Sequence, residues 1–492
     1  MKKIIKFFSL CFVVGAIAIL TNCRPHPYPT DSPWIPFFVI SPNSKMVVYV
    51  KGASLYSSPI TSSTRVAIAP QFYYSINPFS YNIAITPDSA KVVYADLGSN
   101  IYSSPITNSL SITIDTGVDN FIMTPDGTKV VYTKGSFLYS SPITASVPVL
   151  IDTGVSNFLI TPNGSAVVFT DSSSNLYSSP ITTSVTSQPL LIDKGVNTFR
   201  ITPDSGKVVY TNNFSTLYSS PITASVPVLI DTGVSNFLIT PNSSAVVYTN
   251  NSSTLYSSPI TVSVPVQIDT GVTSFIITPN SSAVVYTNSS SNLYSSPITV
   301  SVPVQIDTGV NSFTVTPDST RILYTKGCVS YTSYPYRYSC SLYSSPITAS
   351  VPVELDTDVT NFIVSPDSSK VIYIKNYSYL YGSPITTSAP WLLATEARNF
   401  AITPDSSWVV FTTMFGSLYS VPITGGTLIS IDSENSTDDF LLTPDSKMIV
   451  YKKSRRNSFT GFFAGYTFGL YSSPITASVP VTIDPGDEWR TQ

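Results

Sequence analysis

Aspartates at two recurring positions are the residues of this 492-residue chain that could do chemistry. One set follows proline in a T/S-P-D/N turn, and the other lies in an I-D-T-G turn. The first set is Asp88, Asp126, Asp204, Asp318, Asp367, Asp405 and Asp445, and the second is Asp115, Asp152, Asp231, Asp269 and Asp307. A glycosidase needs only a pair of carboxylates, and oxygen ligands suffice for calcium. Because Asn163, Asn242 and Asn280 replace the first set freely, we expect both sets to cap backbone amides, with weak calcium binding as the alternative.

Other kinds of catalytic chemistry lack their residues in the sequence. The chain has one histidine, His26, whereas Ser-His-Asp and Cys-His catalysis and His-based metal sites all need a positioned histidine. We find no G-x-S-x-G elbow, P-loop or Rossmann fingerprint. We therefore predict a protein that is not an enzyme and has no metal or cofactor.

The turns that carry the first set of aspartates recur about every 38 residues, which marks a repeat architecture. Their prolines are Pro42, Pro87, Pro125, Pro162, Pro203, Pro241, Pro279, Pro317, Pro366, Pro404 and Pro444. In the copy at residues 157–196, β-branched and aromatic runs at 158–161, 166–170, 176–182 and 190–192 are separated by turn residues. Each copy therefore predicts four short antiparallel strands, and no helical periodicity competes with them.

Both faces of these strands are apolar, so each predicted sheet must be covered on two sides. In Val130, Val131 and Tyr132, neighbours that point in opposite directions are all large. A single copy cannot bury enough apolar surface to fold alone, whereas stacked copies share their faces. We expect an all-β protein of eleven repeats, and four strands per copy favour a β-propeller over a β-solenoid.

The repeated T-P-D-S-x-x-V-V-Y and L-Y-S-S-P-I-T elements resemble the WD40-like (PD40) repeat of TolB-type β-propellers. The resemblance covers residues 37–484 and implies a propeller blade for each copy. It does not imply a particular ligand. The chain departs from the family by placing serine, as at Ser89 and Ser205, where glycine usually follows the aspartate. It also has Phe in the first strand, as at Phe121 and Phe158, rather than the tryptophan often found before the turn.

Single propeller rings usually have four to eight blades. Eleven repeats therefore favour two propellers in series, of five and six or of four and seven blades, over one large ring. Whole four-stranded copies, from a first strand near Phe37 to a last one near residues 482–483, give no sign of a strand exchange that would close a ring.

The N-terminus has the features of an exported lipoprotein. Residues 1–22 contain lysines followed by an apolar stretch that is too short to span a membrane, as in a signal peptide. The sequence Leu-Thr-Asn-Cys that ends at Cys23 resembles a bacterial lipobox of the loose spirochaete type, although Asn22 replaces the usual Gly or Ala. We expect a lipid on Cys23, with an ordinary signal peptide as the alternative. Residues 23–35 are a proline-rich tether, 36–486 hold the repeats, and 487–492 are a tail.

Two further cysteines, Cys328 and Cys340, lie in one long loop. An even pair in an exported protein predicts a local disulfide.

Three aromatic insertions break the repeat, at residues 70–80, 326–341 and 452–469. The first joins the last strand of one copy to the next copy, and the other two join the second strand of a copy to its third. In a four-stranded meander these connections share one face, so we expect a single partner-binding face. Its candidate residues are Phe72, Tyr73, Tyr74, Tyr334, Tyr336, Lys452, Lys453, Arg455, Arg456, Phe459, Phe462 and Phe463. The alternative is that the insertions are longer hairpins that pack on themselves.

Composition fits an exported interaction protein. Only 11% of residues are charged and the net charge is −3, so no basic field would attract nucleic acid. We predict a lipid-anchored envelope scaffold, at the outer membrane, that binds a protein or glycan without catalysis. A surface-exposed adhesin or repeat antigen and a carboxylate-dependent glycan-acting enzyme are the alternatives.

Overall fold

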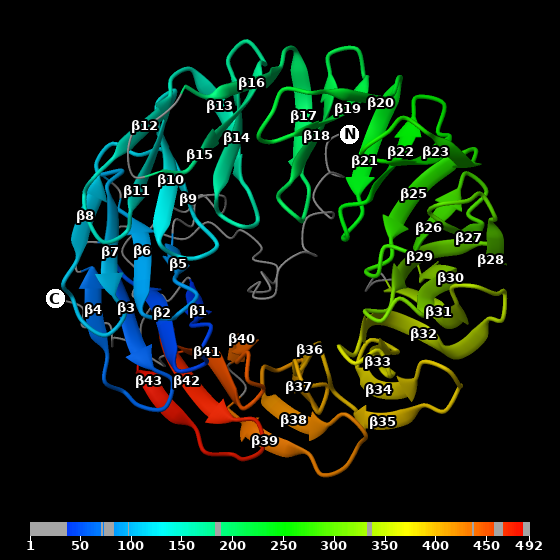
Figure 1. The fold of residues 1–492 in the computed structure, drawn as a ribbon. Helices are drawn as coiled ribbons and strands as arrows, with labels where there is room; N and C mark the ends of the chain where they lie inside the picture. The colour runs from blue at the N-terminus through cyan, green and yellow to red at the C-terminus, as the bar shows by residue number, and fades with distance from the viewer. Residues whose placement is uncertain are drawn as a thin grey trace.

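The computed structural model describes residues 37–69, 72, 83–96, 98–182, 188–331, 337–434, 437–456 and 466–485. The predicted signal peptide, the tether with Cys23 and the C-terminal tail lie outside these residues. In the described part the chain forms one ring of antiparallel β-sheets, each arranged as a blade around a central opening (Figure 1). The protein is thus an all-β propeller, as the sequence predicts.

Each blade is a meander of four strands, here named A to D in chain order, with strand A at the central opening and strand D at the rim (Figure 1). The A strands are β1 (Phe38–Ile40), β5 (Ile83–Ile85), β9 (Asn120–Met123), β13 (Val155–Ile160), β17 (Val196–Ile201), β21 (Val234–Ile239), β25 (Val272–Ile277), β29 (Val310–Val315), β36 (Asn399–Ile402) and β40 (Thr437–Leu442). The B strands are β2 (Met46–Lys51), β6 (Lys91–Ala95), β10 (Lys129–Lys134), β14 (Ala166–Asp171), β18 (Lys207–Asn212), β22 (Ala245–Asn250), β26 (Ala283–Asn288), β30 (Arg321–Tyr331), β33 (Lys370–Lys375), β37 (Trp408–Thr412) and β41 (Met448–Arg456).

The C and D strands complete the blades. The C strands are β3 (Ser54–Pro59), β7 (Ile101–Pro105), β11 (Phe137–Pro142), β15 (Leu176–Pro180), β19 (Leu217–Pro221), β23 (Leu255–Pro259), β27 (Leu293–Pro297), β31 (Arg337–Pro346), β34 (Tyr379–Pro384), β38 (Leu418–Pro422) and β42 (Tyr466–Pro474). The D strands are β4 (Val66–Ala69), β8 (Ile112–Asp115), β12 (Val149–Asp152), β16 (Leu190–Asp193), β20 (Val228–Asp231), β24 (Val266–Asp269), β28 (Val304–Asp307), β35 (Trp391–Ala394), β39 (Ile429–Asp432) and β43 (Val481–Asp484).

One pair of blades is joined more closely than the repeat predicts. Strand β32 (Val353–Val364) runs without a turn from strand D of the eighth blade into strand A of the ninth. The eighth and ninth blades therefore form one seven-stranded sheet, β29 to β35, while the other nine blades are separate four-stranded sheets. The described residues thus contain eleven blades.

The preference for two propellers in series is wrong, because the first and last blades pack against each other. Phe38 and Val47 of the first blade share a buried cluster with Val450, Leu470 and Ile483 of the last. Each of these blades consists of four consecutive strands, so the ring closes by packing between blades rather than by strand exchange. The inter-blade contact used along the chain is repeated at its ends, which is why one large ring forms.

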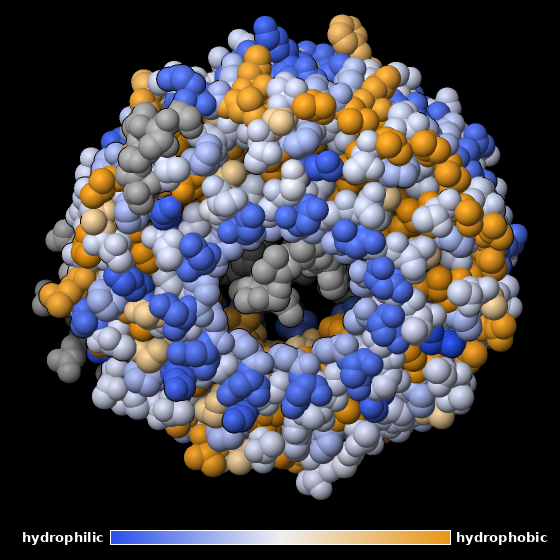
Figure 2. All heavy atoms as spheres, viewed as in Figure 1, coloured by the Kyte–Doolittle hydropathy of each residue, from blue (hydrophilic) through white to orange (hydrophobic). Residues whose placement is uncertain are grey.

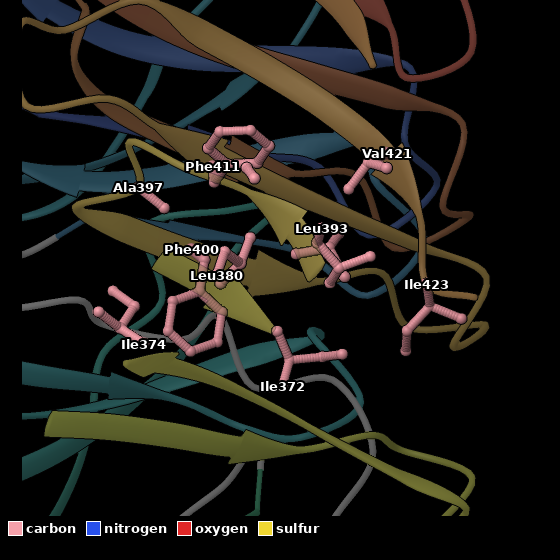
Figure 3. Close-up of a cluster of buried hydrophobic side chains, with 11 residues drawn as sticks. Ile372, Ile374, Leu380, Leu393, Ala397, Phe400, Phe411, Val421 and Ile423 are labelled. Atoms are coloured by element: carbon pink, nitrogen blue, oxygen red, sulfur yellow. The ribbon is translucent and has the colours of Figure 1, made fainter. Parts of the chain in front are cut away.

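The hydrophobic core lies between neighbouring blades. Figure 3 shows one such cluster, in which Ile372 and Leu380 of the ninth blade meet Phe400, Phe411 and Ile423 of the tenth. Similar clusters fill the other interfaces, because adjacent strand B residues point to opposite sides and both are buried. This arrangement explains the two apolar faces in the sequence.

The meander places the connections on two faces. A–B turns and C–D loops lie on one face, called here the turn face, and B–C and D–A connections lie on the other, called the insertion face. The three aromatic insertions fall in the B–C and D–A class. In the described part of the chain, no helix is both long and apolar enough to cross a membrane.

Candidate binding surfaces

The aspartates of the T/S-P-D/N turns cap the turns in which they lie. The Asp204 carboxylate accepts hydrogen bonds from the Thr202 hydroxyl, at 2.5 Å, and from the backbone amide of Gly206, at 3.0 Å. Burial raises the pKa of Asp204, but these hydrogen bonds outweigh it and the net pKa lies below the usual value. The side-chain oxygen of Asn163 makes the equivalent contacts, which confirms the capping role predicted from the exchange of Asp for Asn.

In most copies the serine that follows the turn Asp or Asn ties neighbouring blades together. Ser243 has a φ of 62°, and its hydroxyl accepts a hydrogen bond of 2.9 Å from the backbone amide of Asp204 in the preceding blade. A left-handed backbone costs about 1 kcal/mol for a residue with a β-carbon, which one hydrogen bond of about 1 kcal/mol offsets. The same contact joins Asn43 to Ser89, Asn163 to Ser205, Asn242 to Ser281, Asn280 to Ser319, Asp318 to Ser368, Asp367 to Ser406, Asp405 to Ser446 and Asp445 to Ser44. The serine that departs from the family pattern is thus an inter-blade contact, absent only where Gly127 and Gly164 replace it.

The I-D-T-G aspartates make a second inter-blade contact. Asp115 in strand D of the second blade accepts hydrogen bonds from the buried Tyr132 hydroxyl of the third blade, at 2.7 Å, and from the backbone amide of Thr116. Lys134 adds an ion pair at 3.0 Å. Burial raises the pKa of the Asp115 carboxyl, but the bonds from Tyr132 and Lys134 outweigh it and hold the pKa below its usual value. Equivalent pairs are Tyr210–Asp193, Tyr248–Asp231, Tyr286–Asp269, Tyr324–Asp307, Tyr373–Asp356, Tyr451–Asp432 and Tyr49–Asp484.

A third contact uses the first serine of the L-Y-S-S-P-I-T element. The Ser219 hydroxyl donates to the backbone carbonyl of Ile260 in the next blade, and Ser472 of the last blade donates to Ile60 of the first. In the ninth blade Gly382 replaces this serine, and the Trp391 indole beside it donates to Ile423 at 3.1 Å. A β-carbon on Gly382 would lie 2.6 Å from Trp391, so the glycine is what makes room for the substitute donor.

The closing interface carries a buried cluster of charges. Asp484, fully buried in the last blade, forms ion pairs of 2.6 Å with both Lys51 and Arg65 of the first. It also accepts the Tyr49 hydroxyl. In the part of the chain that the structure describes, no group of three or more His, Cys, Asp or Glu side chains could hold a metal ion.

Several residues of the predicted partner-binding face are buried between blades instead. Phe72 is buried between the first and second blades and makes an edge contact with Tyr94, their ring centroids 6.0 Å apart. It lies where other copies have a buried valine such as Val118. Lys453 is buried and forms 2.6 Å ion pairs with Asp432 and Glu434.

The remaining candidates of that face are divided between buried and undescribed residues. Lys452 is buried beside Lys453 in the last blade. Tyr73, Tyr74, Tyr334, Tyr336, Phe459, Phe462 and Phe463 lie outside the described residues, as do the side chains of Arg455 and Arg456. The described part of the 326–341 insertion is a hairpin that extends β30 and β31, and a disulfide joins Cys328 to Cys340 across it.

The turn face exposes apolar residues that the insertions do not explain. In the sequence Ser-Val-Pro of the C–D loops, the serine hydroxyl donates to the preceding blade, as Ser146 does to Ile114 at 2.9 Å. With the serine turned inward, the next residue is left in solvent, and these valines are 50–59% exposed: Val147, Val226, Val264, Val302, Val351 and Val479. In the view of Figure 2, hydrophilic residues surround the central opening and hydrophobic patches lie farther out. The sequence indicates this exposed apolar surface through the repeated, uncharged I-T-x-S-V-P loop.

The insertion face has a shallow pocket among the described residues, with a cavity volume of about 190 Å³. It lies between the A strands of the eighth and ninth blades, and the disulfide-linked hairpin forms its wall. Its lining residues are Asn311, Ser312, Thr325, Tyr338, Cys340, Val359, Thr360, Asn361 and Phe362. The sequence prediction included the hairpin but missed the asparagines, which are exposed strand residues in other blades too.

Comparison with known proteins finds only distant structural similarity. No family model matches the sequence, and no curated protein matches it either. A crystal structure of a eukaryotic initiation factor aligns with a TM-score of 0.40 and 10% identity, over 80% of this chain and 96% of that one. The tricorn protease aligns with a TM-score of 0.33 and 10% identity over 91% of this chain, which spans 58% of the protease. A putative TolB from Agrobacterium tumefaciens aligns with a TM-score of 0.25 and 16% identity, over 43% of this chain and 80% of that one.

Proposed function

We propose that this protein is a non-enzymatic β-propeller scaffold that holds a protein or glycan partner at the bacterial cell envelope. The proposal rests on the observation that the repeated aspartates hold the fold together. Asp204 caps a turn, and Asp231 accepts the buried hydroxyl of Tyr248 from the next blade. A carboxylate that exchanged protons during catalysis would disturb these contacts in each cycle. A ring fixed by them is better suited to presenting its loops to a partner.

The proposal predicts that the repeated carboxylates can be neutralised without loss of binding. In the variant Asp204→Asn, the amide oxygen keeps both turn contacts, as it does at Asn163. The whole protein and this variant are incubated with a panel of glycans and peptides, with binding followed by NMR and turnover by mass spectrometry. We expect binding without turnover, unchanged by Asp204→Asn. Turnover of any panel member that Asp204→Asn abolishes would show a carboxylate-dependent enzyme instead.

The location is proposed from the sequence around Cys23 and from the resemblance to TolB-type propellers. A lipid on Cys23 would attach the ring to the outer membrane through the proline-rich tether. Mass spectrometry of the N-terminal peptide from membrane fractions tests this directly. We expect a lipid-modified Cys23, and we expect Cys23→Ala to move the protein out of the membrane fraction. An unmodified cysteine, or a signal peptide cut elsewhere, would overturn the anchor and leave the scaffold proposal standing.

A further inference from the structure

The pocket between the eighth and ninth blades has polar groups that the protein itself does not use. Among the described residues, the amides of Asn311 and Asn361 and the hydroxyl of Tyr338 have no hydrogen-bond partner in the protein. All three residues are exposed. Ser312 and Thr325, by contrast, hydrogen-bond to each other at 2.7 Å. The pocket therefore offers two amides, each able to donate and accept, and one hydroxyl.

The apolar part of the pocket comes from fixed elements. Val359 is buried, and Phe362 is a partly buried member of the cluster between the eighth and ninth blades. Tyr338 and Cys340 lie on β31, and the disulfide from Cys340 to Cys328 holds this strand to β30. An aromatic ring on such a wall keeps its place at little entropic cost when a ligand binds.

The wall distinguishes this site from an ordinary blade interface, such as the one beside Asn236. Asn236 of the sixth blade occupies the strand position of Asn361 and is also exposed, but the B–C connection of the blade before it is short. Strands β30 and β31 of the eighth blade have 11 and 10 residues, compared with 6 and 5 for β18 and β19 of the fifth blade. Only a lengthened hairpin places a tyrosine opposite the asparagines.

We propose that this pocket binds one neutral sugar unit of a glycan, an inference that rests on the scaffold function proposed above. None of the nine lining residues is charged, so the site suits a neutral ligand rather than an acidic or basic one. Asparagine amides match the alternating donors and acceptors of vicinal hydroxyls, and Tyr338 and Phe362 match the apolar face of a sugar ring. At about 190 Å³ the cavity is smaller than the roughly 300–1,000 Å³ of pockets that enclose drug-sized ligands. It therefore suits one ring, with the rest of the chain left in solvent.

Saturation-transfer NMR on the whole protein tests the proposal. The probes are the methyl glycosides of glucose, galactose, mannose and N-acetylglucosamine, with glucuronic acid and glucosamine as charged comparators. We expect saturation of at least one neutral glycoside and of neither charged sugar. Asn361→Ala and Tyr338→Ala should each weaken its binding about ten-fold or more, because each removes direct contacts. Asn236→Ala is the matched control and should leave affinity unchanged.

Three results would overturn the proposed sugar site: the protein binds none of the neutral glycosides, it binds only the charged sugars, or Asn361→Ala and Asn236→Ala lower the affinity equally. Circular dichroism of both variants checks that the ring remains folded, which the exposure of both asparagines leads us to expect. Absence of sugar binding would leave the scaffold function intact. Hydrolysis of a bound glycoside would instead contradict the scaffold function while supporting the pocket.

Discussion

The hydroxyl of Tyr49 in the first blade donates a 3.0 Å hydrogen bond to the carboxylate of Asp484 in the last, 435 residues away along the chain. Internal interfaces use the same contact, as between Tyr248 and Asp231. The two ends of the chain are therefore joined by the same hydrogen bond that joins most neighbouring blades. At the closing interface Lys51 and Arg65 reinforce it.

The closing interface should be more sensitive to loss of its aspartate than an internal one. Asp484→Asn leaves the buried Lys51 opposite a neutral amide, and breaking such a buried pair costs about 3–5 kcal/mol. Asp231→Asn weakens the hydrogen bonds from Tyr248 and from the Thr232 backbone amide but leaves no buried cation unpaired, and should cost about 1–2 kcal/mol. Urea unfolding of both variants measures the difference. Equal losses would show that the two ends of the chain do not form the contact described.

The turn serines should respond to substitution in an unusual order. Ser243→Ala removes the hydrogen bond to Asp204 but keeps a β-carbon at a φ of 62°, and should lower the free energy of unfolding by about 1 kcal/mol. Ser243→Gly loses the same bond but relieves the left-handed strain, so it should cost less. Exposed Ser252→Ala is the control. A larger loss for the glycine variant would contradict the explanation.

Gly382 and Trp391 should be strongly coupled. Gly382→Ser alone places a β-carbon 2.6 Å from the Trp391 ring, and Trp391→Val alone removes the donor to Ile423. Both single variants should be destabilised. The double variant restores the Ser-and-Val pair found at Ser257 and Val266, and should recover most of the loss. A double-mutant cycle in urea measures the coupling, and additive losses would contradict it.

Buried tyrosines should make the ring unfold steeply at high pH. Burial, with the hydrogen bond and charge of the paired aspartate, raises the pKa of Tyr248 and its seven equivalents well above 10. Above pH 10 unfolded tyrosines lose protons that folded ones retain, so the unfolded state binds fewer protons. The free energy of unfolding then falls as pH rises, by about 1.4 kcal/mol per pH unit for each tyrosine.

Tyrosinate absorbance and circular dichroism, followed together, test this expectation. The ionisation of the eight buried tyrosines should coincide with the loss of the β-sheet signal. Tyr248→Phe should reduce the pH slope by about one proton, as at Phe169, where the chain naturally lacks the hydroxyl. Ionisation of the buried set while the sheet signal remains native would contradict the buried Tyr–Asp pairs.

The repeated sequence predicts the strands of each blade well, but not their number in a ring. The turn residues around Pro203 and Pro241 define strands A and B directly. Ring size depends on the small angle between neighbouring blades, which no single residue encodes. Because single rings usually have four to eight blades, the sequence favoured two propellers. One signal was available: among the eleven repeats, Tyr49 lies in the first and Asp484 in the last, and neither has a Tyr–Asp partner in an adjacent repeat. Pairing them would have closed a single ring.

The candidate site was predicted only in part, because loops were judged by composition. Loop composition assigns Phe72 to the partner-binding face, although it replaces the buried valine that ends most D–A turns. It assigns Lys453 to the same face, although this lysine lies two residues after a strand B tyrosine, as Lys134 does in its ion pair. The pocket depends on two strands brought together by the ring, so Asn311 and Asn361 could not be paired from the sequence alone.

Electron cryomicroscopy of the purified protein tests the closed ring most directly. Averages viewed along the axis should show one continuous ring of eleven blades, with no gap between the first and the last. Two smaller rings joined by a linker, or an open arc, would contradict the account.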